Sequence, residues 1–195
     1  MSPNGTASVI FKLRGLLWGI FGLCVLVFPV APSAQRAFFA APLLLGGQSL
    51  RFWAAGVIPK YRTLKVGAPR LVTWGPYGMV RNPLYAGNAL MGFGWSLLAG
   101  WPWVAAFAVA FFFLYCLVII PYEEAFLMGE FRDDYMAYRV TTPSLVPNLS
   151  GILRAARGGT EPFDRHASWS MERHSLFMNL AVTALVCFRL FVLDY

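Results

Sequence analysis

Five long apolar runs constrain the fold of this chain more than any other feature of its sequence. They cover residues 15–31, 37–58, 84–99, 101–120 and 176–193. A helix needs about 20 apolar residues to cross a bilayer, and about 17 at the short end. Only 13% of the residues are charged, against about 25% in soluble domains. The sequence therefore predicts an all-α, polytopic membrane bundle of five transmembrane helices, formed by a single domain over residues 1–195.

Lysine and arginine residues gather between particular pairs of these runs, and the pattern predicts the orientation of the bundle. They are Lys60, Arg62, Lys65, Arg70 and Arg81 between the second and third runs, and Arg132, Arg139, Arg154, Arg157, Arg165 and Arg173 between the fourth and fifth. The positive-inside rule places both stretches and the N-terminus in the cytoplasm, although Arg36 in the first external turn is a mild objection. We expect a multi-pass protein of the bacterial inner-membrane type.

The remaining composition excludes two other kinds of site. The net charge of +7 follows from this topology, because the basic residues never form the dense stripe that tracks a nucleic-acid backbone. Cys24, Cys116 and Cys187 each lie inside an apolar run, with no CxxC pair and no histidine nearby. We interpret them as small buried side chains. We expect neither a nucleic-acid partner nor a metal site.

The stretch 123–140 after the fourth run predicts a helix that lies on the membrane surface. Its aromatic and aliphatic residues recur at three- and four-residue spacing, with charged residues between them, as in interfacial helices. The proline-rich segment 141–149 and the glycine-rich segment 157–162 are typical helix breakers. We therefore expect a linker without helix up to the fifth run, with its histidines and arginines solvated or facing lipid headgroups.

The third and fourth runs are separated only by Gly100, so they predict a tight antiparallel hairpin. Its beginning at Asn82 and its end at Glu123 and Glu124 must then lie at the same, cytoplasmic face of the membrane. Each feature has a plainer interpretation as well. Asn82 and Pro83 form a good helix start, and Glu123 could mark the end of a span. Three glycines in the third run suit either close helix packing or the wall of a pocket: Gly87, Gly92 and Gly94.

Two blocks of sequence carry a resemblance to a known family. "LVTWGPYGMVRNPLYAGN" (71–88) and "PYEEAFLMGEFRDDYMAY" (121–138) are similar to the "GxYxxxRHPxYxG" block and the acidic pair with "FGxxYxxY" of the isoprenylcysteine carboxyl methyltransferase family. The resemblance covers about 48–147 and leaves a C-terminal linker and an extra transmembrane helix over 148–195. Asn82 replaces the family's usual histidine, as in the related phosphatidylethanolamine N-methyltransferases. Ile119 stands where the isoprenylcysteine enzymes carry a substrate-binding arginine.

The resemblance implies S-adenosylmethionine as cofactor and assigns residues to its site. The residues that would bind the cofactor are Leu71, Val72, Tyr77, Arg81, Asn82, Pro83, Leu84, Tyr85 and Glu123. Arg81 could instead reach for the membrane surface. Glu124 would take a proton from an amine acceptor. Arg139 and Arg51 would hold an anionic headgroup, and Arg51 lies within the second run, where an ionisable residue is a functional candidate.

These features together predict an S-adenosylmethionine-dependent integral membrane methyltransferase. Its partners would be the bilayer and a lipophilic acceptor, either a lipid amine or a prenylated carboxylate, and Ile119 favours the amine. Two other functions remain open at this point. One is a non-catalytic accessory membrane protein. The other is an NADPH-dependent membrane reductase of the sterol-reductase type, whose terminal region is similar.

Overall fold

A computed structural model describes residues 5–28, 33–58, 70–157 and 163–191, and every regular element in these ranges is a helix. This confirms the all-α prediction. The elements are α1 (Gly5–Val27), α2 (Ala34–Val57), α3 (Pro76–Met79), α4 (Pro83–Ala99), α5 (Trp101–Phe111), the π-helix η1 (Phe112–Ile119), α6 (Ile120–Thr141), α7 (Leu149–Ala156) and α8 (Arg165–Phe191). The bounds of α2 and α4 follow the second and third apolar runs closely.

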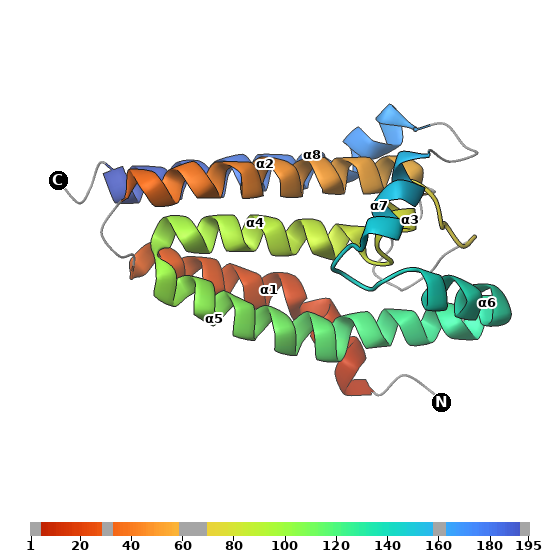
Figure 1. Cartoon of the computed structure of the whole chain (residues 1–195). Helices are drawn as coiled ribbons and strands as arrows, with labels where there is room; N and C mark the ends of the chain where they lie inside the picture. The colour runs from red at the N-terminus through yellow and green to blue at the C-terminus, as the bar shows by residue number, and fades with distance from the viewer. Residues whose placement is uncertain (1–4, 29–32, 59–69, 158–162, 192–195) are drawn as a thin grey trace.

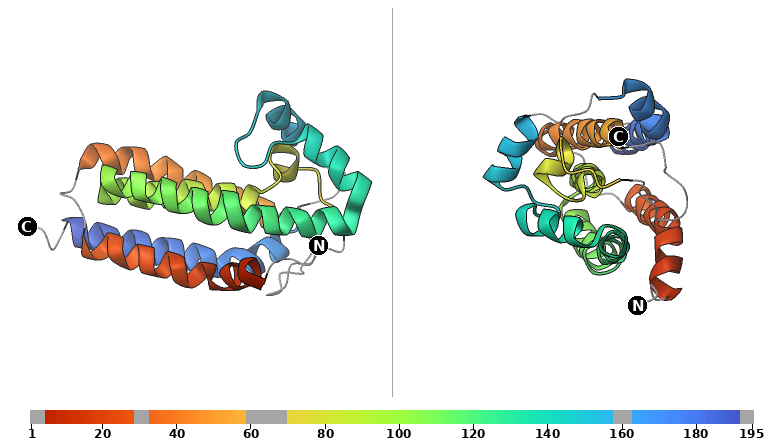
Figure 2. Two further views of the ribbon diagram at one scale, coloured as in Figure 1. Left: turned by 90° about the horizontal axis from the view of Figure 1, so that it is seen from below. Right: turned by 90° about the vertical axis from the view of Figure 1, so that its right-hand side faces the viewer.

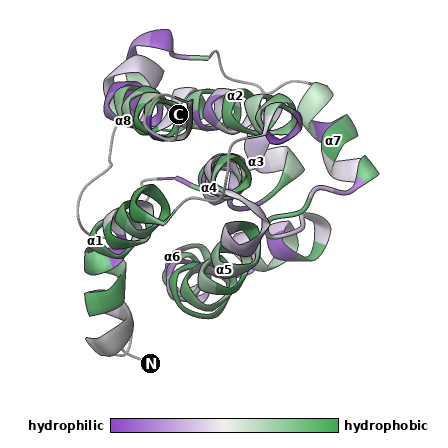
Figure 3. Cartoon of the chain, turned by 90° about the vertical axis from the view of Figure 1, so that its left-hand side faces the viewer, coloured by the Kyte–Doolittle hydropathy of each residue, from purple (hydrophilic) through white to green (hydrophobic). Residues whose placement is uncertain are grey.

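The long helices lie side by side, and the short elements gather at one end of the bundle (Figure 1). Seen along the bundle axis, α4 lies between the pair α2 and α8 and the pair α1 and α5 (Figure 3). One buried apolar cluster joins α2, α4 and α8 around Leu44 and Met91. A second joins α1, α4 and the α5–η1 helix around Phe107 and Tyr115. The helix α4 thus belongs to both cores.

The outer surface of the bundle is unusually apolar. Large hydrophobic side chains are exposed along several helices, among them Leu16, Phe38, Leu45, Phe113 and Met178, and much of the outward ribbon is coloured hydrophobic in Figure 3. Soluble monomers rarely expose continuous apolar surface on this scale. By length and hydropathy, two helices among the described residues can cross a membrane, Ser8–Val27 and Trp101–Thr141. The prediction of five spans goes further than this and stays a prediction.

The predicted boundary between the fourth run and an interfacial helix is wrong. The helical path is continuous from α5 through η1 into α6, and the break comes later, at Arg132 with φ 42° and ψ −110°. The left view of Figure 2 shows the chain turning sharply there. Pro121 lies in the first turn of α6, separated from the end of η1 only by Ile120. The wider turns of η1 change the hydrogen-bond register just before this residue, which has no N–H to donate, so the helix continues through it.

The expectation of a helix-free linker before the fifth run is also wrong. The helix α7 begins after Asn148, whose side chain accepts a hydrogen bond from the Gly151 N–H at 2.8 Å. The helix α8 begins at Arg165, well before the apolar run, with Asp164 Oδ1 accepting from Ala167 N–H at 2.9 Å. Both are ordinary side-chain caps. His166 and His174 therefore lie on α8 and not on a linker.

The glycines of α4 serve helix packing. A Cβ atom on Gly87 would lie 2.5 Å from Arg51 Cγ, one on Gly92 2.0 Å from the Phe107 ring, and one on Gly94 2.8 Å from Leu44. Across the interface, a Cβ atom on Gly47 of α2 would lie 2.7 Å from the Gly87 carbonyl oxygen. The packing interpretation of these glycines is confirmed, because small residues let membrane helices approach closely.

Two adjacent glycines of α2 provide a matched test of this packing. We expect Gly47→Ala to lower the free energy of unfolding by about 1–3 kcal/mol, since the new methyl group meets backbone that cannot move aside. Gly46→Ala has nothing within 4 Å and should be neutral or raise stability by up to about 1 kcal/mol through helix propensity. Unfolding in SDS followed by circular dichroism measures both. Equal effects of the two variants would contradict the packing role.

Candidate functional site

The two ends of the α4–α6 hairpin meet through direct side-chain contacts. Asn82 Nδ2, before α4, donates to Glu124 Oε1 at 3.3 Å. One turn on, the Tyr85 hydroxyl donates to Glu123 Oε1 at 2.6 Å. The chain reverses at Gly100, whose φ of 130° is open to glycine and strained for other residues. The predicted convergence of Asn82 with the acidic pair is confirmed.

Asn82 does more than begin a helix. It occupies the N-cap position of α4, with Pro83 following, but its side chain makes no capping bond. Its Nδ2 instead donates to Glu124 and to the Ser144 hydroxyl at 3.1 Å. The backbone of the same residue pairs with the chain beyond α6, from Asn82 N–H to Ser144 O at 3.1 Å. Asn82 therefore joins the start of α4 to the segment that follows α6, and Ser144 is a member of the cluster that the sequence analysis missed.

Arg81 and Glu124 form the ionic centre of this cluster. Arg81 Nε donates to Glu124 Oε1 at 3.0 Å and Nη2 to Oε2 at 3.2 Å, with both side chains only 11% exposed. Arg81 Nη1 also donates to the Thr142 carbonyl at 2.5 Å. Arg139 lies at the rim, 3.8 Å from Glu124 Oε2 and 52% exposed. A two-point arginine–carboxylate contact fixes orientation as well as charge, so Arg81 is held inside the fold and does not reach out to the membrane surface.

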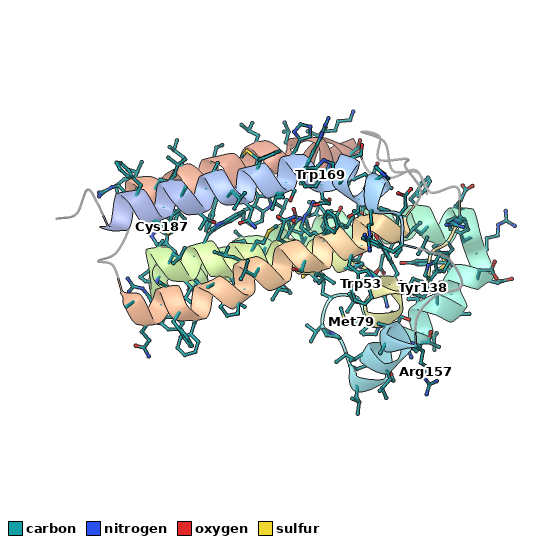
Figure 4. All side chains as sticks on the ribbon, turned by 90° about the horizontal axis from the view of Figure 1, so that it is seen from above. Trp53, Met79, Tyr138, Arg157, Trp169 and Cys187 are labelled. Carbon is teal, nitrogen blue, oxygen red and sulfur yellow. The ribbon has the colours of Figure 1, made fainter. Side chains whose placement is uncertain are left out.

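A small polar cap closes this end of the bundle. The Tyr138 hydroxyl donates to the Tyr77 carbonyl at 2.7 Å. Arg154 of α7 donates to the Gly78 carbonyl at 3.3 Å and to the Thr141 carbonyl at 2.7 Å. Figure 4 shows Tyr138 at the same end as Met79 and Arg157, with Cys187 at the opposite end. The sharp turn at Arg132 is what brings this second half of α6 back over α3.

The Tyr85 ring packs into an aromatic wall contributed by α1 and η1. Its centroid lies 4.8 Å from that of Tyr115, and the Tyr115 hydroxyl accepts a hydrogen bond from Trp18 Nε1 at 3.0 Å. Ile119 is fully buried in η1. Short π-helical segments occur often at functional sites. No local pattern in the sequence predicts the π-helix, and the contribution of Trp18 depends on contacts with residues far along the chain.

The other predicted cofactor residues lie in the segment that leads into α4. Leu71 is half-buried and Val72 is buried, in the irregular stretch before α3, and Pro83 is fully buried. Leu84 supplies its carbonyl oxygen to Arg51 Nη1 at 3.4 Å. In the same stretch, the buried Trp74 Nε1 has no hydrogen-bond partner among the described residues. This donor lies just before α3, in the segment that leads toward Asn82, and would suit a ligand that offers a hydrogen-bond acceptor there.

Comparison with known proteins identifies the family. The phospholipid methyltransferase (PEMT) family model matches residues 35–134, just over half of the chain. The chain belongs to the phospholipid methyltransferase family. Its members are integral membrane methyltransferases that use S-adenosylmethionine, so the protein is such an enzyme and its acceptor is a lipid. The isoprenylcysteine enzymes are a related family, which the match does not show directly. No curated protein and no solved structure matches the chain.

The matched region of this methyltransferase ends before α8, yet α8 supplies a partner to Arg51. Arg51 Nε and Nη2 donate to the two carboxylate oxygens of Glu172, each at 2.9 Å, and Nη1 donates to Asn88 Oδ1 at 2.5 Å. Arg51 is 6% and Glu172 0% exposed. The position of Arg51 within an apolar run predicts a contact with a lipid headgroup. The structure directs its guanidinium to α4 and α8 instead, and a headgroup contact stays a prediction.

Proposed function

We propose that this enzyme transfers a methyl group from S-adenosylmethionine to the amine of a membrane lipid. The observation that carries the proposal is the meeting of Asn82 and Tyr85 with the acidic pair at one end of the bundle. The family supports a lipid acceptor. Ile119, apolar and fully buried, offers no cation for the carboxylate of a prenylated acceptor, which favours the amine.

The cofactor pocket that we propose lies between the start of α4, the start of α6 and the stretch before α3. Glu123 would accept hydrogen bonds from an ammonium or ribose hydroxyl, and Tyr85 holds that carboxylate in place at 2.6 Å. Contacts between a carboxylate and a cation are short and strong when partly dehydrated. Asn82 and Tyr77 would add polar contacts, and Leu71, Val72, Pro83 and Leu84 would line the apolar side. Arg81 would hold the cofactor's carboxylate only by sharing its donors with Glu124.

Bound S-adenosylmethionine supplies an electrophilic methyl group on a sulfonium. The protein's task in such an in-line displacement is to align the acceptor and to exclude water. In such a transfer the amine nitrogen would take the methyl group, S-adenosylhomocysteine would leave as the neutral thioether, and the amine would lose a proton. We propose Glu124 as the group that takes this proton. Its carboxylate already accepts from Arg81 and Asn82, so those two residues would also position it.

Lipid recognition would take place at the rim of the same site. Arg139 is the half-exposed cation nearest to Glu124, and we propose that it binds the phosphate of the acceptor lipid. The positive-inside pattern supports a cytoplasmic orientation for this end of the bundle. The water-soluble cofactor would then arrive from the cytoplasm, and the lipid would enter sideways between helices.

The acceptor class has a direct test. Purified enzyme with radiolabelled S-adenosylmethionine is offered nanodiscs of phosphatidylethanolamine and, separately, a prenylcysteine analogue. We expect label in the amine lipid and none in the prenylcysteine analogue. Arg139→Ala should raise the KM for the lipid with little change in kcat, because the proposed contact lies away from the reacting atoms. Methylation of the prenylcysteine analogue alone would refute the amine assignment.

A further inference from the structure

A cavity of about 420 Å³ lies between α2 and α8. Its α2 side belongs to the family-matched residues 35–134, and its α8 side lies outside them. This volume falls in the range of small-molecule sites. Its lining is contributed by α2, α8 and a residue two positions before α8, namely Gln48, Ser49, Phe52, Trp53, Phe163 and Leu176. None of these described lining residues carries a charge. The site is an apolar pocket with a few polar groups, on the outer face of the bundle.

The side-chain amide of Gln48, which lines this pocket, is only partly satisfied by the residues that the structure describes. Gln48 is 9% exposed, and its Oε1 accepts a hydrogen bond from Asn179 Nδ2 at 3.3 Å. Its Nε2 is buried without a hydrogen-bond partner among the described residues. A buried, unsatisfied N–H costs about 1–3 kcal/mol, so a ligand with an acceptor oxygen would stabilise the pocket.

The surroundings decide which kind of acceptor oxygen fits. Arg51, one turn along α2, is neutralised by Glu172 at 2.8 Å, and no described lining residue is charged, so the pocket lining itself offers no cation to a free carboxylate. Trp53 is 37% exposed and lies at the same end of the bundle as the polar cap (Figure 4). Tryptophan is enriched at the membrane–water interface. The ester region of a lipid lies at that depth, with its acyl chain directed into the apolar part.

We propose that this pocket binds a glycerolipid, with an ester carbonyl accepting from Gln48 Nε2 and an acyl chain against Phe52, Phe163 and Leu176. The assignment rests on the membrane placement in the proposed function and extends it to a lipid subsite. Phe163 packs closely against α2, because a Cβ atom on Gly56 would lie 2.0 Å from its ring, and the Asp164 N–H donates to the Gly56 carbonyl at 2.9 Å. Two lining residues, Phe163 and Leu176, come from α8 and the segment just before it. Relatives without this helix would therefore lack the subsite.

Photo-crosslinking tests the pocket directly. The probe is a phosphatidylcholine with a diazirine in its acyl chain, incorporated in nanodiscs with the full-length enzyme, and labelled peptides are identified by mass spectrometry. We expect label on α2 and α8 peptides that contain the lining residues. Leu176→Trp fills the cavity and should abolish this label. Gln48→Met keeps the side-chain length and should reduce it about two- to tenfold, the range for one hydrogen bond.

Two control variants separate the pocket from general damage. Asn179→Ala breaks the bond to Gln48 but leaves the pocket N–H. Ser96→Ala removes a buried hydroxyl on α4 that has no hydrogen-bond partner within the described part of the chain. Both should label like the wild type. Equal labelling of wild type, Leu176→Trp and Gln48→Met would overturn the proposal, and so would stronger competition by palmitate than by phosphatidylcholine.

The kinetics show which lipid uses the subsite. If Gln48→Met raises the KM for the amine lipid, the lipid in the pocket is the methyl acceptor itself. If the KM is unchanged, the pocket holds a structural lipid. Either result supports lipid binding in the pocket. Binding of S-adenosylhomocysteine should be the same in all four variants. An enzyme that failed to methylate any amine lipid but still labelled at α2 and α8 would refute the proposed function and leave the lipid subsite standing.

Discussion

Replacing Glu172 by glutamine is expected to give the largest loss of stability of any single change in this protein. Glu172 is fully buried and accepts two hydrogen bonds from Arg51. The variant leaves the charge of Arg51 uncompensated in a low-dielectric interior, which costs about 3–5 kcal/mol when a buried pair is broken. Reversible unfolding in SDS, followed by circular dichroism, measures the change.

A double variant shows whether stability is lost because the ion pair is missing or because one charge is left buried without its partner. Arg51→Met combined with Glu172→Met removes both charges and keeps comparable volume, and such replacements are often neutral or even stabilising. We therefore expect the double variant to be more stable than Glu172→Gln alone. If Glu172→Gln unfolds like the wild type, Arg51 and Glu172 are not an ion pair in the membrane.

Replacing Glu123 by glutamine is expected to give the largest loss of cofactor affinity. The proposed role is a charge-assisted hydrogen bond to the cofactor, worth about 1.5–3 kcal/mol. The corresponding weakening is roughly 10- to 150-fold in Kd. Calorimetric titration of the detergent-purified enzyme with S-adenosylhomocysteine measures it. An unchanged affinity would remove Glu123 from the cofactor site.

Two variants act as controls for this experiment. Glu130→Gln makes the same chemical change on an exposed part of α6 and should leave affinity unchanged. Tyr85→Phe keeps the ring against Tyr115 and removes only the hydroxyl that donates to Glu123. We expect it to weaken binding less than Glu123→Gln, because the carboxylate loses its orientation but keeps its charge. A loss with Glu130→Gln as large as that with Glu123→Gln would indicate a general charge effect.

The features that the sequence predicted well depend on hydropathy and on local geometry. The hairpin through Gly100 had to be antiparallel, because a single-residue connection between two long helices allows no other arrangement. Asn82 therefore had to approach the acidic pair. The cap role of Asn82 was the reasonable local interpretation, yet its side chain bonds to Glu124. A charged partner from distant sequence outweighed the local preference.

The features that the sequence did not predict depend on partners far along the chain. Arg51 looked like an isolated charge within an apolar run, and only the packing of α8 shows that Glu172 neutralises it. The first half of α8 was taken for a linker because its polar residues mask the helical pattern. The sharp turn falls on Arg132, three residues after the glycine at position 129, and the turn residue itself is neither glycine nor proline. A pattern within one segment cannot show what a neighbouring segment will supply.

The pairing of Arg51 with α8 bears on where this chain can be truncated without loss of the fold. The family match stops at residue 134, within α6, and excludes the carboxylate that balances a cation inside the matched part. The end of the family match is therefore not the boundary of an independent structural unit. A version trimmed to the matched stretch would carry a bare charge in its interior, and we expect its expression yield in membranes to collapse although each proposed cofactor residue would still be present.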